Sequence, residues 1–157
     1  MPADYRTRLA TPDDASLLSE MRRLMFTGMG KPDDDRMQQV VEAFIPWVAD
    51  AIRREIYIGW IVDTSAGTPV ANAGLLLIDW PPNSRDLNPV RGYVMNVWTH
   101  PEHRRKGIAR HLMEVVMTEA NRRSIRVLAL HASDEGKILY DQLGFRDNRE
   151  MLFVDET

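Results

Sequence analysis

Apolar residues recur at helical spacing in the first part of the chain. Leu17, Met21 and Leu24 fall on one face of a helix, and Thr11 followed by a proline marks the start of that helix. We expect the helix to end near residues 28–30, which include two glycines. A short extended segment at residues 5–10 precedes it.

A second helical pattern begins after residues 32–35, which read Pro-Asp-Asp-Asp. Its apolar face comprises Met37, Val40, Val41, Phe44, Val48, Ala51 and Ile52. Pro46 lies within this pattern and lacks a backbone N–H donor, so we expect either a kink or two separate helical pieces.

The second half of the chain alternates between strand and helix patterns. Large apolar and β-branched residues predict strands at residues 56–62, 69–79, 92–99, 127–130 and 151–154. Turn-forming residues 65–68 predict a hairpin between the first two of these, and the prolines of residues 80–89 predict a loop. Helices are predicted at residues 104–123 and 135–143, the latter ended by Gly144.

The order of these elements predicts an α+β fold: a mixed, mostly antiparallel sheet flanked by about four helices. The strand, helix and strand between residues 92 and 130 predict one parallel pair within that sheet. Neither an internal repeat nor a Gly/Ser-rich linker divides the sequence, so we predict a single domain over residues 1–157.

Composition excludes several functional classes. The chain has 44% hydrophobic and 27% charged residues, and no apolar run approaches the roughly 20 residues that span a bilayer. It contains no Cys, which excludes disulfides, thiolate metal sites and a covalent thioester intermediate on the protein. The net charge of -3 provides no general attraction to nucleic acid or anionic lipid. Because the start of the sequence does not resemble an export signal, we expect a cytoplasmic protein.

The most informative segment lies between the strand at 92–99 and the helix that follows it. Arg104, Arg105 and Lys106 stand where that helix begins, although cations are unfavourable at the positive end of a helix dipole. A bound anion would compensate for them, and Gly107 and Ala109 are small enough for a ligand to approach the main chain. The segment therefore predicts a turn whose backbone amides hold a pyrophosphate. Nucleic acid is a much weaker alternative, because the chain is acidic overall.

This segment resembles the acetyl-coenzyme A signature of the GNAT superfamily of N-acetyltransferases, Q/R-x-x-G-x-G/A. Arg104, Gly107 and Ala109 occupy its three defined positions. The later segment 130–145 is similar to the second motif of the family, which ends in Leu-Tyr-x-x-x-Gly-Phe and here contains Tyr140. The two motifs occur in order and at the expected separation, and the predicted element order agrees with the family fold, in which the central parallel strands splay apart.

The resemblance implies a site for acetyl-CoA, used as a cosubstrate. Its pyrophosphate would be held by the turn, its pantetheine arm would pair with the strand before the turn, and Ser133 stands where the family often has Asn. The residues implied to bind the cofactor are Val97, Trp98, Thr99, Arg104, Arg105, Lys106, Gly107, Ile108, Ala109, Arg110, Ser133 and Lys137. For Lys137, a place on the helix surface is an equal alternative. The amide of Val97 is a candidate oxyanion donor.

Tyr140 is implied to be catalytic. With a reference pKa of about 10, its hydroxyl is neutral at pH 7 and can donate a proton to a departing thiolate. Many family members carry a Glu on the fourth strand as general base, but residues 92–97 contain no carboxylate. His131, His100 or water relayed through Asn96 remain as alternatives. The histidines share no ligand face, so we predict no metal site.

We therefore predict an enzyme that transfers acetyl from acetyl-CoA to a primary amine by direct attack in a ternary complex. The alternative is a non-catalytic acyl-CoA sensor or interaction module on the same fold. The acceptor, a small molecule or a peptide, stays open, as does a homodimer; no nucleic acid or membrane partner is expected. Asp33, Asp34 and Asp35 either offset the dipole of the second helix or form an acidic rim that attracts a cationic amine, and Trp80 is a candidate for the acceptor pocket.

Overall fold

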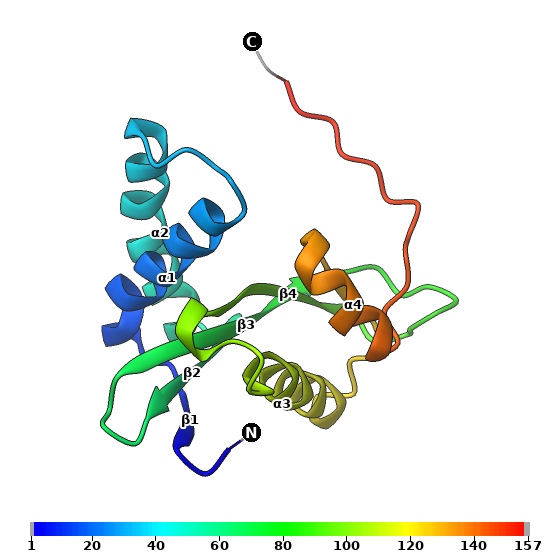
Figure 1. Ribbon diagram of the computed structural model, residues 1–157. Coiled ribbons are helices and arrows are strands. Elements are labelled where there is room, and N and C mark those ends of the chain that lie inside the picture. Colours follow the sequence, from blue (N-terminus) through cyan, green and yellow to red (C-terminus); the bar gives the residue numbers. More distant parts are fainter. Residues whose placement is uncertain (1, 156–157) are drawn as a thin grey trace.

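The computed structural model describes residues 2–155, which form a five-stranded sheet covered by helices on both faces (Figure 1). The strands are β1 (Tyr5–Leu9), β2 (Tyr57–Thr64), β3 (Pro69–Asp79), β4 (Val90–Thr99) and β5 (Leu128–Leu130). The α-helices are α1 (Ala15–Gly28), α2 (Asp35–Arg53), α3 (Ile108–Arg122) and α4 (Asp134–Gln142), and short 3-10 helices span Pro12–Asp14 and Pro101–His103. The predicted α+β class is confirmed.

The sheet is mixed, as predicted. Its strand order is β1-β2-β3-β4-β5, and the first three pairings are antiparallel, including the expected hairpin of β2 and β3. Among the described strands only β4 and β5 run parallel, and they pair over just three residues, from Gly92 opposite Leu128 to Val94 opposite Leu130. Beyond Val94 the two strands no longer pair, so among residues 2–155 the second half of β4 has no strand partner on that side.

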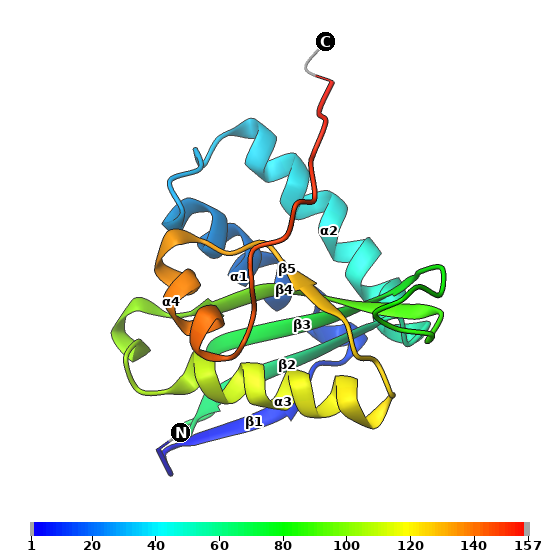
Figure 2. The same cartoon turned by 90° about the vertical axis from the view of Figure 1, so that its right-hand side faces the viewer.

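Two hydrophobic clusters attach the helices to opposite faces of the sheet. Figure 2 shows α3 in front of the sheet and α1 and α2 behind it. The cluster beneath α3 also receives Tyr140 from α4, and its buried members include Val62, Leu75, Leu112, Met113 and Val116. The cluster beneath α1 and α2 includes Leu18, Phe44, Val48, Ile61 and Trp98. Trp98 and Val94 of β4 therefore belong to different faces of the same strand.

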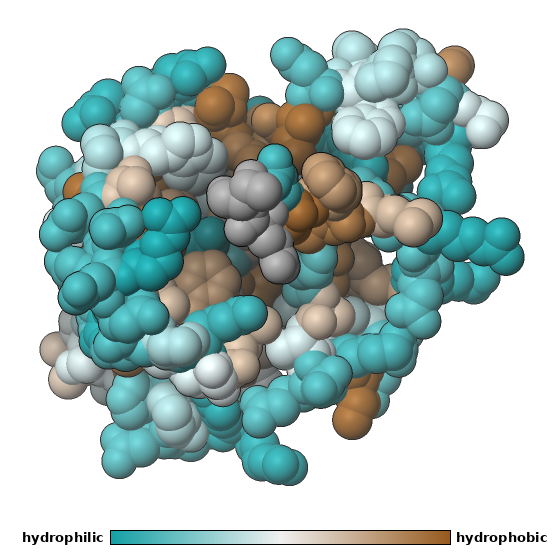
Figure 3. All heavy atoms as spheres, turned by 90° about the horizontal axis from the view of Figure 1, so that it is seen from above, coloured by the Kyte–Doolittle hydropathy of each residue, from teal (hydrophilic) through white to brown (hydrophobic). Residues whose placement is uncertain are grey.

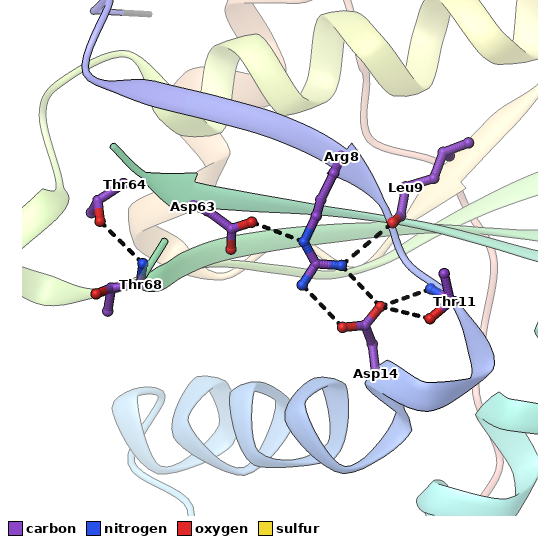
Figure 4. Close-up of polar contacts among 7 residues, drawn as sticks. All are labelled: Arg8, Leu9, Thr11, Asp14, Asp63, Thr64 and Thr68. Carbon is purple, nitrogen blue, oxygen red and sulfur yellow. Dashed lines mark hydrogen bonds and ion pairs between the residues drawn. The ribbon is translucent and has the colours of Figure 1, made fainter. Parts of the chain in front are cut away.

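Arg8 ties the start of α1 to the sheet (Figure 4). Its guanidinium donates two hydrogen bonds to Asp14, at 2.9 and 3.0 Å, and one from Nε to Asp63 of β2, at 2.8 Å. Asp14 also accepts from the backbone N–H of Thr11, at 2.8 Å. The bond to Arg8 lowers the pKa of Asp14, and the same bond raises the pKa of Arg8. The ionised pair fixes where α1 leaves the sheet.

The helix α2 passes through Pro46 as one element, so the alternative of two separate pieces is wrong. Pro46 is exposed, and the carbonyl four residues earlier, on exposed Glu42, can be hydrated instead of bonded to an amide. Phe44, Val48 and Ala51 on the buried face meanwhile pack into the cluster beneath the helix. Packing of this apolar face outweighs the missing backbone bond.

The predicted last strand at residues 151–154 is also wrong, because residues 145–155 form neither helix nor strand. Met151, Leu152, Phe153 and Val154 are all exposed, and the segment runs away from the sheet (Figure 1). Seen from above, apolar side chains gather near the middle of this face among hydrophilic ones (Figure 3). A strand needs a neighbour for its backbone hydrogen bonds, and the three-residue β5 presents little edge.

The helix predicted from residue 104 begins four residues later, at Ile108, because residues 104–107 form a turn. Within residues 2–155, no helix combines the length and the apolarity that a membrane crossing requires.

Candidate active site

A pocket of about 570 Å³ lies between the second half of β4, the C-terminal part of α1, and the starts of α3 and α4. It opens where β4 and β5 separate. The predicted site residues that line it are Val97, Trp98, Thr99, Arg104, Arg105, Gly107, Ile108, Ala109, Arg110, Ser133 and Tyr140. The structure thus brings together residues from three elements that the sequence motifs had implied separately.

The turn before α3 has the shape of an anion cradle. Arg105 and Gly107 both adopt left-handed backbone conformations, with φ of 60° and 76°. Within residues 2–155, none of the six amides from Arg105 to Arg110 donates to a backbone or side-chain acceptor. Consecutive free amides at the positive end of a helix are a recurrent way to bind phosphate. The donor set therefore fits a pyrophosphate.

The second half of β4 supplies a free strand edge next to this turn. A register shift against β3 leaves Asn96 and Val97 opposite a single residue, because Met95 pairs with Gly74 and Trp98 with Asn72. Asn96 takes a left-handed φ of 57° in this bulge. With β5 diverging beyond Val94, the main chain of residues 95–99 can pair with an extended, amide-bearing ligand such as pantetheine.

Tyr140 of α4 reaches the pocket wall and is only 8% exposed. Burial raises the pKa of its hydroxyl, so the group remains a proton donor well above neutral pH. Its ring packs edge-on against Phe145, with centroids 5.9 Å apart. Gly136 makes room for this ring, because a Cβ there would lie 2.8 Å from it.

Three side chains predicted to contact the cofactor have hydrogen-bond or ion-pair partners within the protein. Ser133 lines the pocket, but its hydroxyl accepts the backbone N–H of Gly136 as the N-cap of α4, at 3.1 Å. Lys137 is not among the lining residues and pairs with Asp141 and Asp147. Lys106 also lies outside the lining and bonds the hydroxyl of Tyr5, at 3.3 Å. Their roles toward a cofactor stay predictions.

The acidic triplet does not reach the pocket. Asp33 pairs with Arg23, and Asp34 accepts the backbone N–H of Met37, which is the capping role expected of it. Trp80 lines a separate cavity at the other end of β4, with Arg91 over its ring. Of the residues considered as a general base, His131 and Asn96 line the pocket and His100 does not. The Nδ1 of His131 lies 2.7 Å from the hydroxyl of Tyr93.

Sequence reasoning missed the contribution of α1. Arg22, Met25, Phe26 and Met29 line the pocket at helical spacing, opposite the turn before α3. Their pattern resembles that of any amphipathic helix, so only the packing of α1 against β4 reveals their place. Glu135 was also missed; it is the only carboxylate among the described lining residues, and it lies 3.6 Å from Arg104.

Family comparison agrees with this site. Residues 18–145 match the acetyltransferase (GNAT) family, and the chain belongs to that family. Acetyl-CoA is its cosubstrate, as the two motifs implied. No curated protein matches the chain in sequence.

Solved structures show the same fold. A GCN5-related N-acetyltransferase from Ralstonia eutropha JMP134 is 30% identical, with a TM-score of 0.91 over 98% of this chain and 99% of that one. A predicted acetyltransferase from Clostridium acetobutylicum, solved with acetyl-CoA, is 27% identical, with a TM-score of 0.85 over 96% of each chain. A ribosomal-protein-alanine N-acetyltransferase from Brucella melitensis biovar Abortus 2308 shares the fold at 18% identity, with a TM-score of 0.70 over 98% of this chain and 99% of that one.

Proposed function

We propose that this protein transfers the acetyl group of acetyl-CoA to a primary amine, by direct attack within a ternary complex. One observation supports this above all: the six free amides of residues 105–110 and the unpaired edge of β4 border the same pocket. Because the chain has no Cys, a thioester on the protein is excluded, and direct transfer is the simpler route.

In this proposal, different residues of the pocket act on different parts of acetyl-CoA. The amides of residues 105–110 hold the pyrophosphate, and the edge of β4 orients the pantetheine arm. Acetyl-CoA supplies the activated acetyl thioester when bound. In this proposal the amide of Val97 donates to the carbonyl oxygen and the neutral hydroxyl of Tyr140 protonates the departing sulfur; that both residues line the pocket supports these roles. Among the general bases considered from the sequence, the imidazole of His131 lines the pocket, and in this proposal it accepts a proton from the attacking amine.

Titration calorimetry followed by a thiol-release assay tests the proposal. We expect acetyl-CoA to bind in the micromolar range typical of enzyme substrates, and at least one member of a primary-amine panel to accelerate release of the CoA thiol. Adenosine 3′,5′-bisphosphate, which lacks the pyrophosphate and the pantetheine arm, is the matched weak ligand. Absence of acetyl-CoA binding at millimolar concentration rejects the proposal.

The alternative, a non-catalytic acyl-CoA sensor, is favoured by one feature: β4 offers no carboxylate as base, and Glu135 already pairs with Arg104. Acetyl-CoA binding without thiol release by any amine or peptide would support the sensor instead. The two proposals therefore separate in one experiment.

A further inference from the structure

Arg22 occupies an unusual position at the α1 end of the pocket. Its guanidinium carbon lies 4.6 Å from the ring centroid of Phe26 and 4.9 Å from that of Phe44. Its Nη1 donates to the side-chain oxygen of Asn96, whose amide nitrogen donates in turn to the hydroxyl of Tyr57, at 3.0 Å. Two aromatic rings and a neutral amide thus hold the cation in place.

No described carboxylate compensates the charge of Arg22. Within residues 2–155 it forms no ion pair, and its Nε is buried without a hydrogen-bond acceptor. Burial lowers the pKa of this guanidinium, whereas Arg8 and Arg23, each paired with acids, have raised pKa values. A desolvated cation without an anion is unfavourable, so its place in a pocket calls for a ligand that supplies the negative charge.

The residues that line the pocket near Arg22 indicate which chemical class of ligand would fit. The other arginines in the lining are Arg104 and Arg105 of the turn before α3 and Arg110 of the first turn of that helix, beside the free amides proposed to bind the pyrophosphate. The lining residues of α1 and the nearby part of β4 are otherwise mostly apolar and include Met25, Phe26, Met29, Met95 and Trp98, with Asn96 as the polar side chain that bonds Arg22. A polyamine would meet a fixed positive charge here, with no described carboxylate at this end to bind its second amine.

We propose that Arg22 binds the carboxylate of the acceptor, and that the acceptor is an amino acid or a similar amine that carries a carboxylate and an apolar side chain. The inference rests on the proposed function and names its substrate class. A planar guanidinium can bind a carboxylate through two parallel hydrogen bonds, and the aromatic rings and Asn96 keep it oriented for that contact. Arg22 is thereby a specificity-determining residue, which fixes one end of the acceptor while its amine approaches the thioester.

Matched acceptor pairs test the assignment. Phenylalanine is compared with 2-phenylethylamine, and methionine with 3-(methylthio)propylamine, so that each pair differs only in the carboxylate. We expect the intact protein to prefer the amino acid of a pair by at least about 30-fold in kcat/KM, the size of effect that a charge-assisted bidentate contact provides. Arg22→Met should reduce this ratio to near unity, mainly through KM, and leave the Kd for acetyl-CoA within about threefold.

Arg23→Met is the matched control, because Arg23 is adjacent on α1 but pairs with Glu20 and Asp33 away from the lining. It should leave the ratio unchanged. Arg22→Gln keeps a polar side chain and provides a second variant should the Met variant fold poorly. Equal rates within each pair, a preference for the decarboxylated amines, or an unchanged ratio in both Arg22 variants would overturn the inference.

Two further measurements test for a phosphate-bearing acceptor and cover the case in which no amine releases thiol. Phosphoethanolamine and ethanolamine form a pair that carries phosphate instead; a stronger Arg22-dependent preference there would overturn the carboxylate assignment. If no amine releases thiol, the proposed function fails, and the inference is decided by calorimetry on the CoA complex. N-acetylphenylalanine should then bind at least about tenfold more tightly than N-acetyl-2-phenylethylamine, and only when Arg22 is present; equal binding would reject it.

Discussion

The two ends of the pocket are built from different parts of the chain. At the end near α3, the main-chain amides of six consecutive residues have no hydrogen-bond acceptor among the described residues. At the end near α1, the charged group is a side chain: Arg22 of α1 donates to Asn96 of β4, which donates in turn to the buried Tyr57 of β2. The first end is continuous in sequence, and the second is assembled from three distant segments.

This difference separates general from particular recognition. A main-chain cradle needs small residues and left-handed conformations at defined spacing, so any protein that binds the same phosphate can use the same motif. A side-chain network depends on how α1 rests against β4, and its chemistry changes with one substitution. The α3 end therefore carries the motif typical of the cosubstrate, whereas the α1 end is where we propose that acceptors are discriminated.

The largest expected effect lies between the two ends, at Tyr140. Tyr140→Phe removes the proposed proton donor while the ring keeps its packing, so kcat should fall by about 100-fold. The Kd for acetyl-CoA should change by less than about threefold, because the hydroxyl acts on the departing thiolate. Steady-state kinetics with calorimetry measure both, and Thr68→Val, which removes an exposed hydroxyl beside the β2–β3 turn and outside the lining, is the control. An unchanged kcat would remove Tyr140 from the mechanism.

The α3 end is tested at Gly107, whose φ of 76° disfavours residues with a Cβ. No atom lies within 4 Å of a Cβ placed there, so strain alone should act. Gly107→Val should raise the free energy of the binding-competent turn by roughly 1–2 kcal/mol and so weaken acetyl-CoA binding by about 5- to 30-fold. Gly107→Asn, which tolerates this conformation, should bind nearly normally. Equal affinities in the two variants would show that the left-handed turn is dispensable.

The α1 end is tested through the titration of Tyr57, since burial raises its pKa to about 12. The folded protein holds this proton more tightly than the unfolded chain, whose tyrosine ionises near pH 10. The contribution to stability is therefore complete below pH 10 and is lost between about pH 10 and 12, with a loss of about 1 kcal/mol by pH 11. Urea unfolding at pH 8 and pH 11 measures it.

Tyr57→Phe should make the loss of unfolding free energy between pH 8 and pH 11 smaller. Part of the loss should remain, because Tyr93 and Tyr140 also have raised pKa values. Arg22 faces the Tyr57 hydroxyl, and its positive charge opposes the shift that burial causes. An identical alkaline loss in the Phe variant would mean that Tyr57 ionises normally in the folded state.

The smallest effect is expected at Asn72, which contrasts with Asn96. Both amides are buried, but within residues 2–155 neither side-chain polar atom of Asn72 has a hydrogen-bond partner. Asn72→Val should therefore be neutral or stabilising by up to about 1 kcal/mol. Asn96→Val should destabilise, both because it leaves Tyr57 and Arg22 unpaired and because it puts a β-branched residue at a φ of 57°. Thermal unfolding compares the two, and a large loss in the Asn72 variant would contradict this.

Much of the fold could be predicted from local patterns. The amphipathic faces of α1, α2 and α3, the β2–β3 hairpin and the parallel pair are all present, because periodicity and turn residues act over a few positions. The errors occurred where a distant partner decides. Pro46 lies within a single helix because the buried face of α2 packs well against the sheet. Residues 151–154 form no strand because no sheet edge is available for them to pair with.

Some features of the candidate site could likewise be predicted from the sequence, and others depend on packing. The sequence alone predicted the turn before α3, because backbone conformation and helix-end electrostatics are encoded by neighbouring residues. The place of Tyr140 in the pocket was implied by the resemblance of residues 130–145 to the second family motif. Only the tertiary structure decided that Arg22 enters the pocket, that β4 bulges at Asn96, and that Lys137 pairs with acids instead of lining the pocket. These outcomes depend on which helices and strands pack against one another. Packing decides which polar and charged groups are buried and which partners they have, and no local sequence pattern encodes that.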